Sequence, residues 1–222
     1  MYRILALKVG SRTGFSSLDV EEDESKVPVG ISLVQYGIIR MPVPPEDAET
    51  YPWDCIIASK KGGQILAKLV SDVKPRVVVV EENKGRHYSQ KLLEFLHSAL
   101  LTHISLDTEA PAVFYLSTSE WRSSLGIRLS KEDKKANQKL SKAKKASVDG
   151  KIDRKALGVR GKLTPKHLAV RHVNKRFGLQ LKLKDNDVAD SICLGEAFAL
   201  GSRPCTGNDK VRGINPYYGV KN

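Results

Sequence analysis

Three acidic side chains stand where they could reach one common site. Glu81 follows the apolar run at residues 77–80, and a run without polar alternation predicts a central strand covered on both faces. Asp187 and Asp190 are three residues apart at the start of a predicted helix, so their carboxylates lie on one helical face. In a sheet with parallel central strands, functional groups gather at the carboxyl ends of those strands. The pattern therefore predicts an acidic site, formed by these three carboxylates, that could carry out chemistry.

Each acid alone also has an ordinary interpretation. Glu81 could end its strand facing solvent, and Asp187 and Asp190 are favourable near the positive end of a helix dipole. A fourth residue makes the combination informative. Lys8 ends the first apolar run of the chain, where a strand is expected to reach the same edge of the sheet. Lysine is an unusual residue at the end of a buried strand.

The elements that position these residues follow from the hydrophobic spacing. Three early apolar segments predict antiparallel strands, and alternating helices and strands follow. This order predicts an α/β fold with a mixed five-stranded sheet flanked by helices, in one domain over residues 1–201. Residues 202–222 are rich in Gly, Pro and Asn and are expected to be irregular. The expected strands are 3–9, 15 onward, 29–39, 76–81 and 112–116, with a loop at 20–28, and the expected helices are 54–73, 89–103, 119–125 (capped by Ser119), 165–177 and 187–200.

The positive charge is concentrated in one segment. Residues 120–184 hold 20 Lys and Arg against 5 Asp and Glu, a charge of +15, whereas the whole chain carries +12. A basic insert at about 127–163 indicates a polyanion partner, with nucleic acid the first choice, although a solvated loop is the alternative. Residues 131–146 have helical propensity but only Leu140 as a large apolar anchor, so we expect them to be mobile or ordered on a partner.

Membrane and metal-thiolate classes find no support in the sequence. No apolar run approaches the roughly 20 residues of a membrane span, and no long apolar segment of a signal peptide begins the chain. Cys55, Cys193 and Cys205 are widely spaced and match no zinc pattern, so we expect reduced thiols. A cytoplasmic protein is expected.

Three motifs resemble those of the RuvC-type Holliday junction resolvases. The stretch Asp187-Val-Ala-Asp190 resembles the aspartate pair that opens the final helix in that family, and the apolar strand ending at Glu81 resembles its second motif. The stretch from Ile4 through Lys8 to the Gly-Ser-Arg turn resembles its first motif. The phage branch, which also has a pair like Trp121-Arg122 before its basic segment, is the most similar, and the resemblance covers about residues 3–201.

The resemblance implies a ribonuclease H-like fold and a homodimer that resolves four-way or otherwise branched DNA. It also implies phosphodiester hydrolysis with two metal ions, Mg²⁺ or Mn²⁺, held by four carboxylates. Glu81, Asp187 and Asp190 match three of them. At the fourth position the family carries aspartate, and this chain carries Lys8. Glu82 is expected to point to the other side of its strand and so not to replace it.

Lys8 changes the expected activity. An ammonium among carboxylates fills the cation position with its own charge and removes a ligand, so we expect poor metal binding and little or no cleavage. Either an engineered substitution or a natural loss of catalysis fits. The alternative function is a non-catalytic protein of the same fold that binds branched DNA or RNA, and a third is a regulatory interaction protein that does not bind DNA.

Basic and aromatic side chains complete the expected DNA surface, because phosphate contacts by Lys and Arg supply most nonspecific affinity. Tyr88 could stack on an unpaired base or could simply start its helix. The candidate contacts are Arg12, Lys84, Arg86, Tyr88, Arg122, Arg128, Lys131, Lys134, Lys135, Lys142, Lys144, Lys145, Arg160, Lys162 and Lys166.

Overall fold

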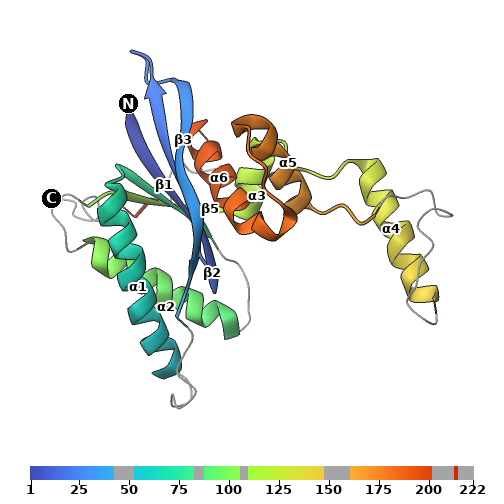
Figure 1. Ribbon diagram of the computed structural model, residues 1–222, viewed down its shortest axis with the longest axis horizontal. Coiled ribbons are helices and arrows are strands. Elements are labelled where there is room, and N and C mark those ends of the chain that lie inside the picture. Colours follow the sequence, from blue (N-terminus) through green and yellow to red (C-terminus); the bar gives the residue numbers. More distant parts are fainter. Residues whose placement is uncertain (43–52, 83–87, 106–109, 148–160, 202–212, 215–222) are drawn as a thin grey trace.

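The computed structural model describes residues 1–42, 53–82, 88–105, 110–147, 161–201 and 213–214 (Figure 1). They form one mixed sheet with helices on both faces. The sheet has the strand order β3-β2-β1-β4-β5-β6. The strands are β1 (Tyr2–Lys8), β2 (Arg12–Glu22), β3 (Pro28–Arg40), β4 (Val77–Glu82), β5 (Ala112–Ser117) and β6 (Gly213–Ile214).

The strand directions confirm the predicted α/β sheet. β1, β2 and β3 pair antiparallel, and β4 and β5 join β1 as parallel strands. The two-residue β6 adds an antiparallel edge within the tail expected to be irregular. The expected loop at 20–28 is shorter, because buried Val20 still pairs with Ile31 and keeps β2 in the sheet to Glu22.

Alternating residues of the central strands build two cores, as the period of two in a strand requires. Leu5 and Leu7 of β1 face helices α1 (Trp53–Val73) and α2 (Tyr88–Ser105). Ile4 and Ala6 face the opposite layer. That layer consists of α3 (Thr118–Ser124), α5 (Pro165–Phe177), the short η1 (Leu183–Asp185) and α6 (Asn186–Ala199). Among the described residues no helix is long and apolar enough to cross a membrane.

Helix α6 is the most deeply buried helix, and it sits directly on β2. A Cβ atom added to Gly14 would lie 2.0 Å from the backbone oxygen of Asp187. Gly14 pairs with Lys8 across β1 and β2. The absence of a side chain at Gly14 therefore lets the start of α6 approach the sheet beside the end of β1.

The N-cap of helix α3 lies two residues earlier than expected. Ser117, rather than Ser119, is the N-cap: its backbone N–H donates to Glu120 Oε2 at 2.7 Å, and its hydroxyl accepts from the Glu120 N–H at 3.4 Å. This capping box (Ser-x-x-Glu) satisfies two backbone N–H groups at the N-terminus of the helix. The shift places Thr118 and Trp121 at the end of β5, close to the end of β4.

Part of the basic insert, residues 131–146, forms a helix, α4 (Lys131–Ala146), where a segment that is mobile or ordered on a partner was expected. Ser130 and Asp133 close a second capping box at its start. Figure 1 shows α4 set apart from the sheet and joined to it by the segments after α3 and before α5. The helix is tied to the second segment by the Asn137 side chain, whose amide donates to Leu163 O at 2.6 Å and accepts from Leu163 N at 3.0 Å.

Candidate functional site

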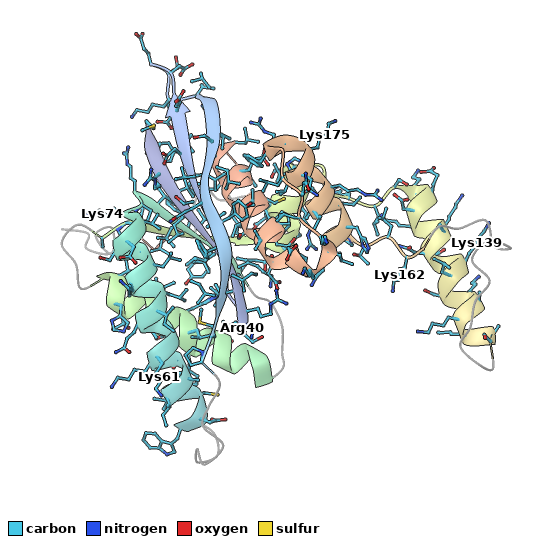
Figure 2. The ribbon with its side chains drawn as sticks, in the orientation of Figure 1. Arg40, Lys61, Lys74, Lys139, Lys162 and Lys175 are labelled. Carbon is cyan, nitrogen blue, oxygen red and sulfur yellow. The ribbon has the colours of Figure 1, made fainter. Side chains whose placement is uncertain are left out.

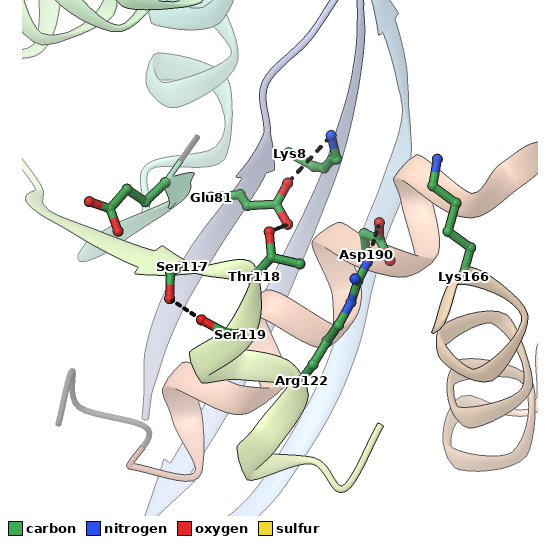
Figure 3. Close-up of a pocket in the computed structure, with 9 residues that line it drawn as sticks. Lys8, Glu81, Ser117, Thr118, Ser119, Arg122, Lys166 and Asp190 are labelled. Carbon is green, nitrogen blue, oxygen red and sulfur yellow. Dashed lines mark hydrogen bonds and ion pairs between the residues drawn. The ribbon is translucent and has the colours of Figure 1, made fainter. Parts of the chain in front are cut away.

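A pocket opens at the carboxyl ends of β1, β4 and β5, between α3 and α6 (Figure 3). Parallel strands that end together make this edge the expected place for a site. Cationic, anionic and hydroxyl side chains share its wall. The lining residues are Lys8, Glu81, Glu82, Ser117, Thr118, Ser119, Arg122, Lys166 and Asp190.

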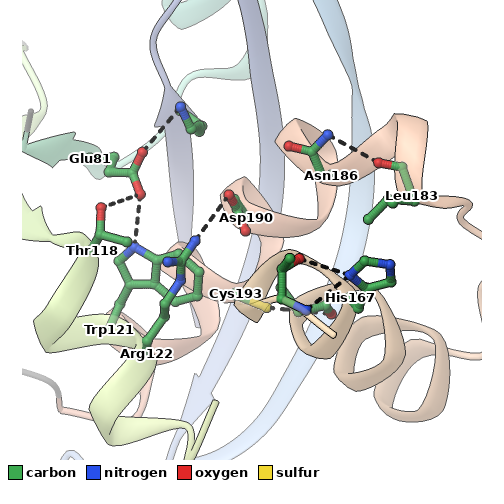
Figure 4. Close-up of polar contacts among 12 residues, drawn as sticks. Glu81, Thr118, Trp121, Arg122, His167, Leu183, Asn186, Asp190 and Cys193 are labelled. Atoms are coloured by element: carbon green, nitrogen blue, oxygen red, sulfur yellow. Dashed lines mark hydrogen bonds and ion pairs between the residues drawn. The ribbon is translucent and has the colours of Figure 1, made fainter. Parts of the chain in front are cut away.

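Three donors hold the carboxylate of Glu81 (Figure 4). The Lys8 ammonium lies 3.3 Å from Oε2. The other oxygen accepts from the Thr118 hydroxyl at 2.9 Å and from the Trp121 indole N–H at 3.1 Å. Trp121 is fully buried, so the donor on this side belongs to the hydrophobic core. Glu81 is therefore oriented by the core on one side and by Lys8 on the other.

Asp190 is the second carboxylate of the pocket and is 2% exposed. Arg122 Nη2 lies 3.5 Å from its Oδ2, while Oδ1 is buried without a hydrogen-bond partner among the described residues. Burial raises the pKa of Asp190 to about 6, and repulsion from Glu81 adds to the rise. Arg122, Lys8 and Lys166 act in the opposite direction. The folded protein thus holds a strained carboxylate at neutral pH.

This shift predicts a pH-dependent gain from Asp190→Asn. Because the folded state binds the Asp190 proton more tightly than the unfolded state, this group's contribution to stability falls as pH rises from 3.8 to about 6. The difference in free energy of unfolding, variant minus parent, should grow by about 3 kcal/mol over that window and then level off. Urea unfolding at several pH values measures it.

Asp19→Asn is a control for which the pH dependence of stability should have the opposite sign. Arg3 hydrogen-bonds Asp19 at 2.6 Å and 2.8 Å and lowers the pKa of that carboxyl. Its contribution is present at neutral pH and is lost as pH falls through the lowered pKa. If the difference in free energy of unfolding between Asp190→Asn and the parent did not change with pH, burial would not be raising the pKa of Asp190.

The predicted acids do not all reach the pocket. Glu81 and Asp190 do, whereas Asp187 is not among the lining residues, and its backbone packs over Gly14. Glu82, expected on the other side of β4, does line the pocket. The pocket spans the ends of the strands, so the last residue of β4 borders it whichever face its side chain takes.

The donor set does not fit a metal pair. Within the described parts of the chain, no three His, Cys, Asp or Glu side chains lie close enough together to hold a metal ion. The two carboxylates that do meet here each contact a protein cation, Lys8 in one case and Arg122 in the other. Lys8, Arg122 and Lys166 balance the charges of the three acids that line the pocket. Such a pocket lacks the excess negative charge that attracts hard cations.

The predicted DNA contacts fall into three groups. Arg122 and Lys166 line the pocket. Arg12 donates to the Lys184 carbonyl at 3.4 Å, and Arg128 donates to the Ser123 hydroxyl. Exposed cations continue outward through Lys162 to α4, where Lys139 is labelled in Figure 2. The remaining predicted contacts cannot be placed: Lys84, Arg86 and Arg160 lie outside the described residues, as does the side chain of Tyr88.

Sequence reasoning missed the hydroxyl and indole partners of Glu81. Thr118 and Trp121 follow the capping serine of α3, and both bond the same oxygen of Glu81. The signal was available in the Ser117-x-x-Glu120 pattern, which marks the start of a helix at the end of a buried strand. Trp121 is fully buried in the core and also donates a hydrogen bond to Glu81 of the pocket.

Comparison with known proteins identifies the fold. No family model matches the chain, and no curated protein matches it in sequence. Among solved structures, Thermus thermophilus RuvC matches with a TM-score of 0.55 at 11% identity, over 90% of this chain and 95% of that one. The fold is that of RuvC.

Two further structures extend the likeness to that fold. T. thermophilus RuvC in complex with a Holliday junction substrate matches with a TM-score of 0.57 at 10% identity, over 90% of this chain and 94% of the other. The yeast mitochondrial Holliday junction resolvase Ydc2 matches with a TM-score of 0.51 at 15% identity, over 90% of this chain and 79% of the other. The RuvC-like, ribonuclease H-like architecture predicted from the motifs is confirmed.

Proposed function

We propose that this chain, which has the fold of a junction resolvase, binds branched DNA and cleaves it little or not at all. The observation that carries the proposal is the Lys8 ammonium 3.3 Å from Glu81, at the strand end where the resembled family carries an acid. The protein supplies a fixed cation where cleavage would require a metal. The sequence left open a nuclease, a non-catalytic binder and an interaction protein, and between the first two this geometry favours the binder.

The Lys8–Glu81 pair is well protected from solvent. The side chains are 26% and 11% exposed, so their attraction is less screened than that of a surface pair. A metal ion at Glu81 would have to displace the ammonium, and the displaced charge would remain in a half-buried setting. The pocket is therefore poorly suited to metal-dependent hydrolysis.

A DNA phosphate that entered the pocket would meet cationic side chains there. Lys8, Arg122 and Lys166 reach one pocket from three different elements, β1, α3 and α5. The Arg122 side chain is 21% exposed, so part of it remains accessible to a phosphate oxygen that enters the pocket. A homodimer would present two such pockets to the symmetric strands of a four-way junction.

Comparison of binding and cleavage tests the proposal. The unmodified chain is expected to bind a four-way junction more tightly than linear duplex of the same sequence and to show no Mg²⁺-stimulated nicking. Equal affinity for the two DNAs would overturn the claim of branch selectivity. Brisk Mg²⁺-dependent cleavage by the unmodified chain would overturn the claim that Lys8 suppresses catalysis.

Lys8→Asp is the informative variant. It restores a carboxylate beside Glu81 and Asp190, so Mg²⁺ is expected to raise the melting temperature of this variant and to support nicking. Lys8→Ala is the matched control, because it removes the ammonium without adding a ligand and should respond much less to Mg²⁺. If Lys8→Asp gains no thermal shift with Mg²⁺ or Mn²⁺, Lys8 is not what keeps metal out.

A further inference from the structure

Helix α4 carries its lysines on one face. At about 100° per residue, six of its seven lysines fall within an arc of about 140° around the helix axis. Neither of its acids, Glu132 and Asp133, projects into that arc, and all six lysines are exposed. This lysine stripe consists of Lys131, Lys134, Lys135, Lys139, Lys142 and Lys145.

The opposite face of α4 holds the helix against the rest of the protein. Leu140, 6% exposed, lies about half a turn away from the centre of the stripe. Asn137 is on the same side and forms both hydrogen bonds to Leu163. Since α4 makes no extensive contact with another described helix or strand, this side alone orients it. The stripe therefore faces away from the segment that anchors the helix.

The stripe works against the stability of an isolated helix. Lys131, Lys135 and Lys139 follow one another at intervals of four residues, and like charges at this spacing repel. A purely solubilising helix would intersperse acids among them. Six like charges on one face, spread over about 21 Å, instead match a polyanion with regularly spaced charges.

Duplex DNA is the polyanion that fits these features. It carries one negative charge per about 1.7 Å of axis, so several phosphates lie within reach of the stripe. Lysines are flexible point charges that bind phosphate without selecting a base. Helix α4 contains no aromatic side chain on which an unpaired base could stack, which disfavours a single strand.

The chain joins α4 to two elements that contribute cations to the pocket. The helix follows α3, which carries Arg122, and precedes α5, which carries Lys166. Arg128 and Lys162 are in the two connecting segments. From these observations we propose that α4 grips a duplex arm of the DNA through its lysine stripe, while the pocket holds the branch point. This inference rests on the proposed function, which it deepens by assigning separate parts of the DNA to separate surfaces.

The helical register distinguishes two neighbouring lysines. Lys139 lies on the stripe, although the sequence did not single it out as a contact. Lys144, which it did single out, lies on the other side of the helix. Lys139→Gln should therefore weaken DNA binding, and Lys144→Gln should leave it nearly unchanged.

A salt series on combined variants tests the proposal. The variant Lys135→Gln/Lys139→Gln/Lys142→Gln of the full chain should bind a junction with long arms roughly 10- to 100-fold more weakly at about 0.1 M salt. Its slope of log affinity against log salt should be shallower by about 2.7, because each phosphate contact contributes about 0.9. Fluorescence anisotropy with labelled DNA measures both quantities.

The control removes the same charge elsewhere. Lys60→Gln/Lys61→Gln/Lys144→Gln changes three exposed lysines off the stripe, two of them on α1, and should keep the parent slope. Equal slopes for the parent and the stripe variant would overturn the role of α4. So would an equal loss in both variants, which would mean that net charge alone sets affinity.

The outcome is separable from the proposed function. The stripe is tested by the change in salt slope, which can be measured on long linear duplex as well as on a junction. The proposed function is tested by the ratio of junction to linear affinity in the unmodified chain. If the unmodified chain bound junction and linear DNA equally, but the stripe variant still had a shallower salt slope, α4 would be a duplex-binding helix on a protein without branch selectivity.

Discussion

Trp121→Ala is expected to lower the free energy of unfolding by about 3–5 kcal/mol, which is typical of truncating a buried aromatic side chain. Trp121 is 0% exposed and packs in the core beneath α6. The change also removes the indole donor to Glu81 and the ring over which the Arg122 guanidinium lies at 4.8 Å. Urea unfolding followed by circular dichroism measures the loss.

The only other tryptophan of the chain provides the control. Trp53, at the start of α1, is 55% exposed, so Trp53→Ala should change stability by well under 1 kcal/mol. Trp121→Phe keeps an aromatic ring but leaves Glu81 without the indole N–H, and an intermediate loss of about 1–3 kcal/mol is expected. Equal stability of the Phe variant and the parent would show that the hydrogen bond to Glu81 contributes nothing.

Gly14→Ala is expected to destabilise the fold by about 3 kcal/mol or more, at or beyond the upper end for overpacking. The new methyl would lie 2.0 Å from the Asp187 oxygen and 2.9 Å from the Val188 nitrogen, and backbone atoms cannot rotate aside. Helix α6 must therefore shift, and Asp190 must shift with it. Weaker junction binding should accompany the lower unfolding midpoint.

Gly30→Ala tests whether this cost is specific to the contact with α6. Gly30 is also in an antiparallel strand, but the nearest atom to its added Cβ would be the flexible end of the Glu21 side chain at 3.2 Å. We expect a loss of less than about 1 kcal/mol. Similar losses for the two variants would mean that intrinsic strand propensity, rather than the position of α6, accounts for the effect.

The sheet was predictable because its buried strands are apolar runs that can be recognised in the sequence. The run at 77–80 lacks alternation, and β4 is indeed covered on both faces. The length of β2 was not predictable from composition, because residues 20–22 are acidic or lie next to acids and resemble a loop. Pairing with β3 decides their conformation, and such long-range pairing leaves little local signal.

The candidate site was predictable only in part. Glu81 and Lys8 follow from strand ends, and Asp190 follows from helical spacing. Spacing alone could not separate Asp190 from Asp187, because the close contact at Gly14 decides which of the two reaches the pocket. The order of α4 was missed because its stabilising contacts, a capping box and Asn137 bonded to Leu163, are polar and leave no hydrophobic pattern.

Because Glu81 is hydrogen-bonded to the core, its carboxylate is expected to persist as the sequence changes. Its carboxylate is fixed by Thr118 and by the buried Trp121, so changes that disturb it also disturb folding. Selection for a folded protein then maintains this acidic group even in a lineage that gains nothing from cutting DNA. A variant with an acid at position 8 would find the surrounding geometry already assembled.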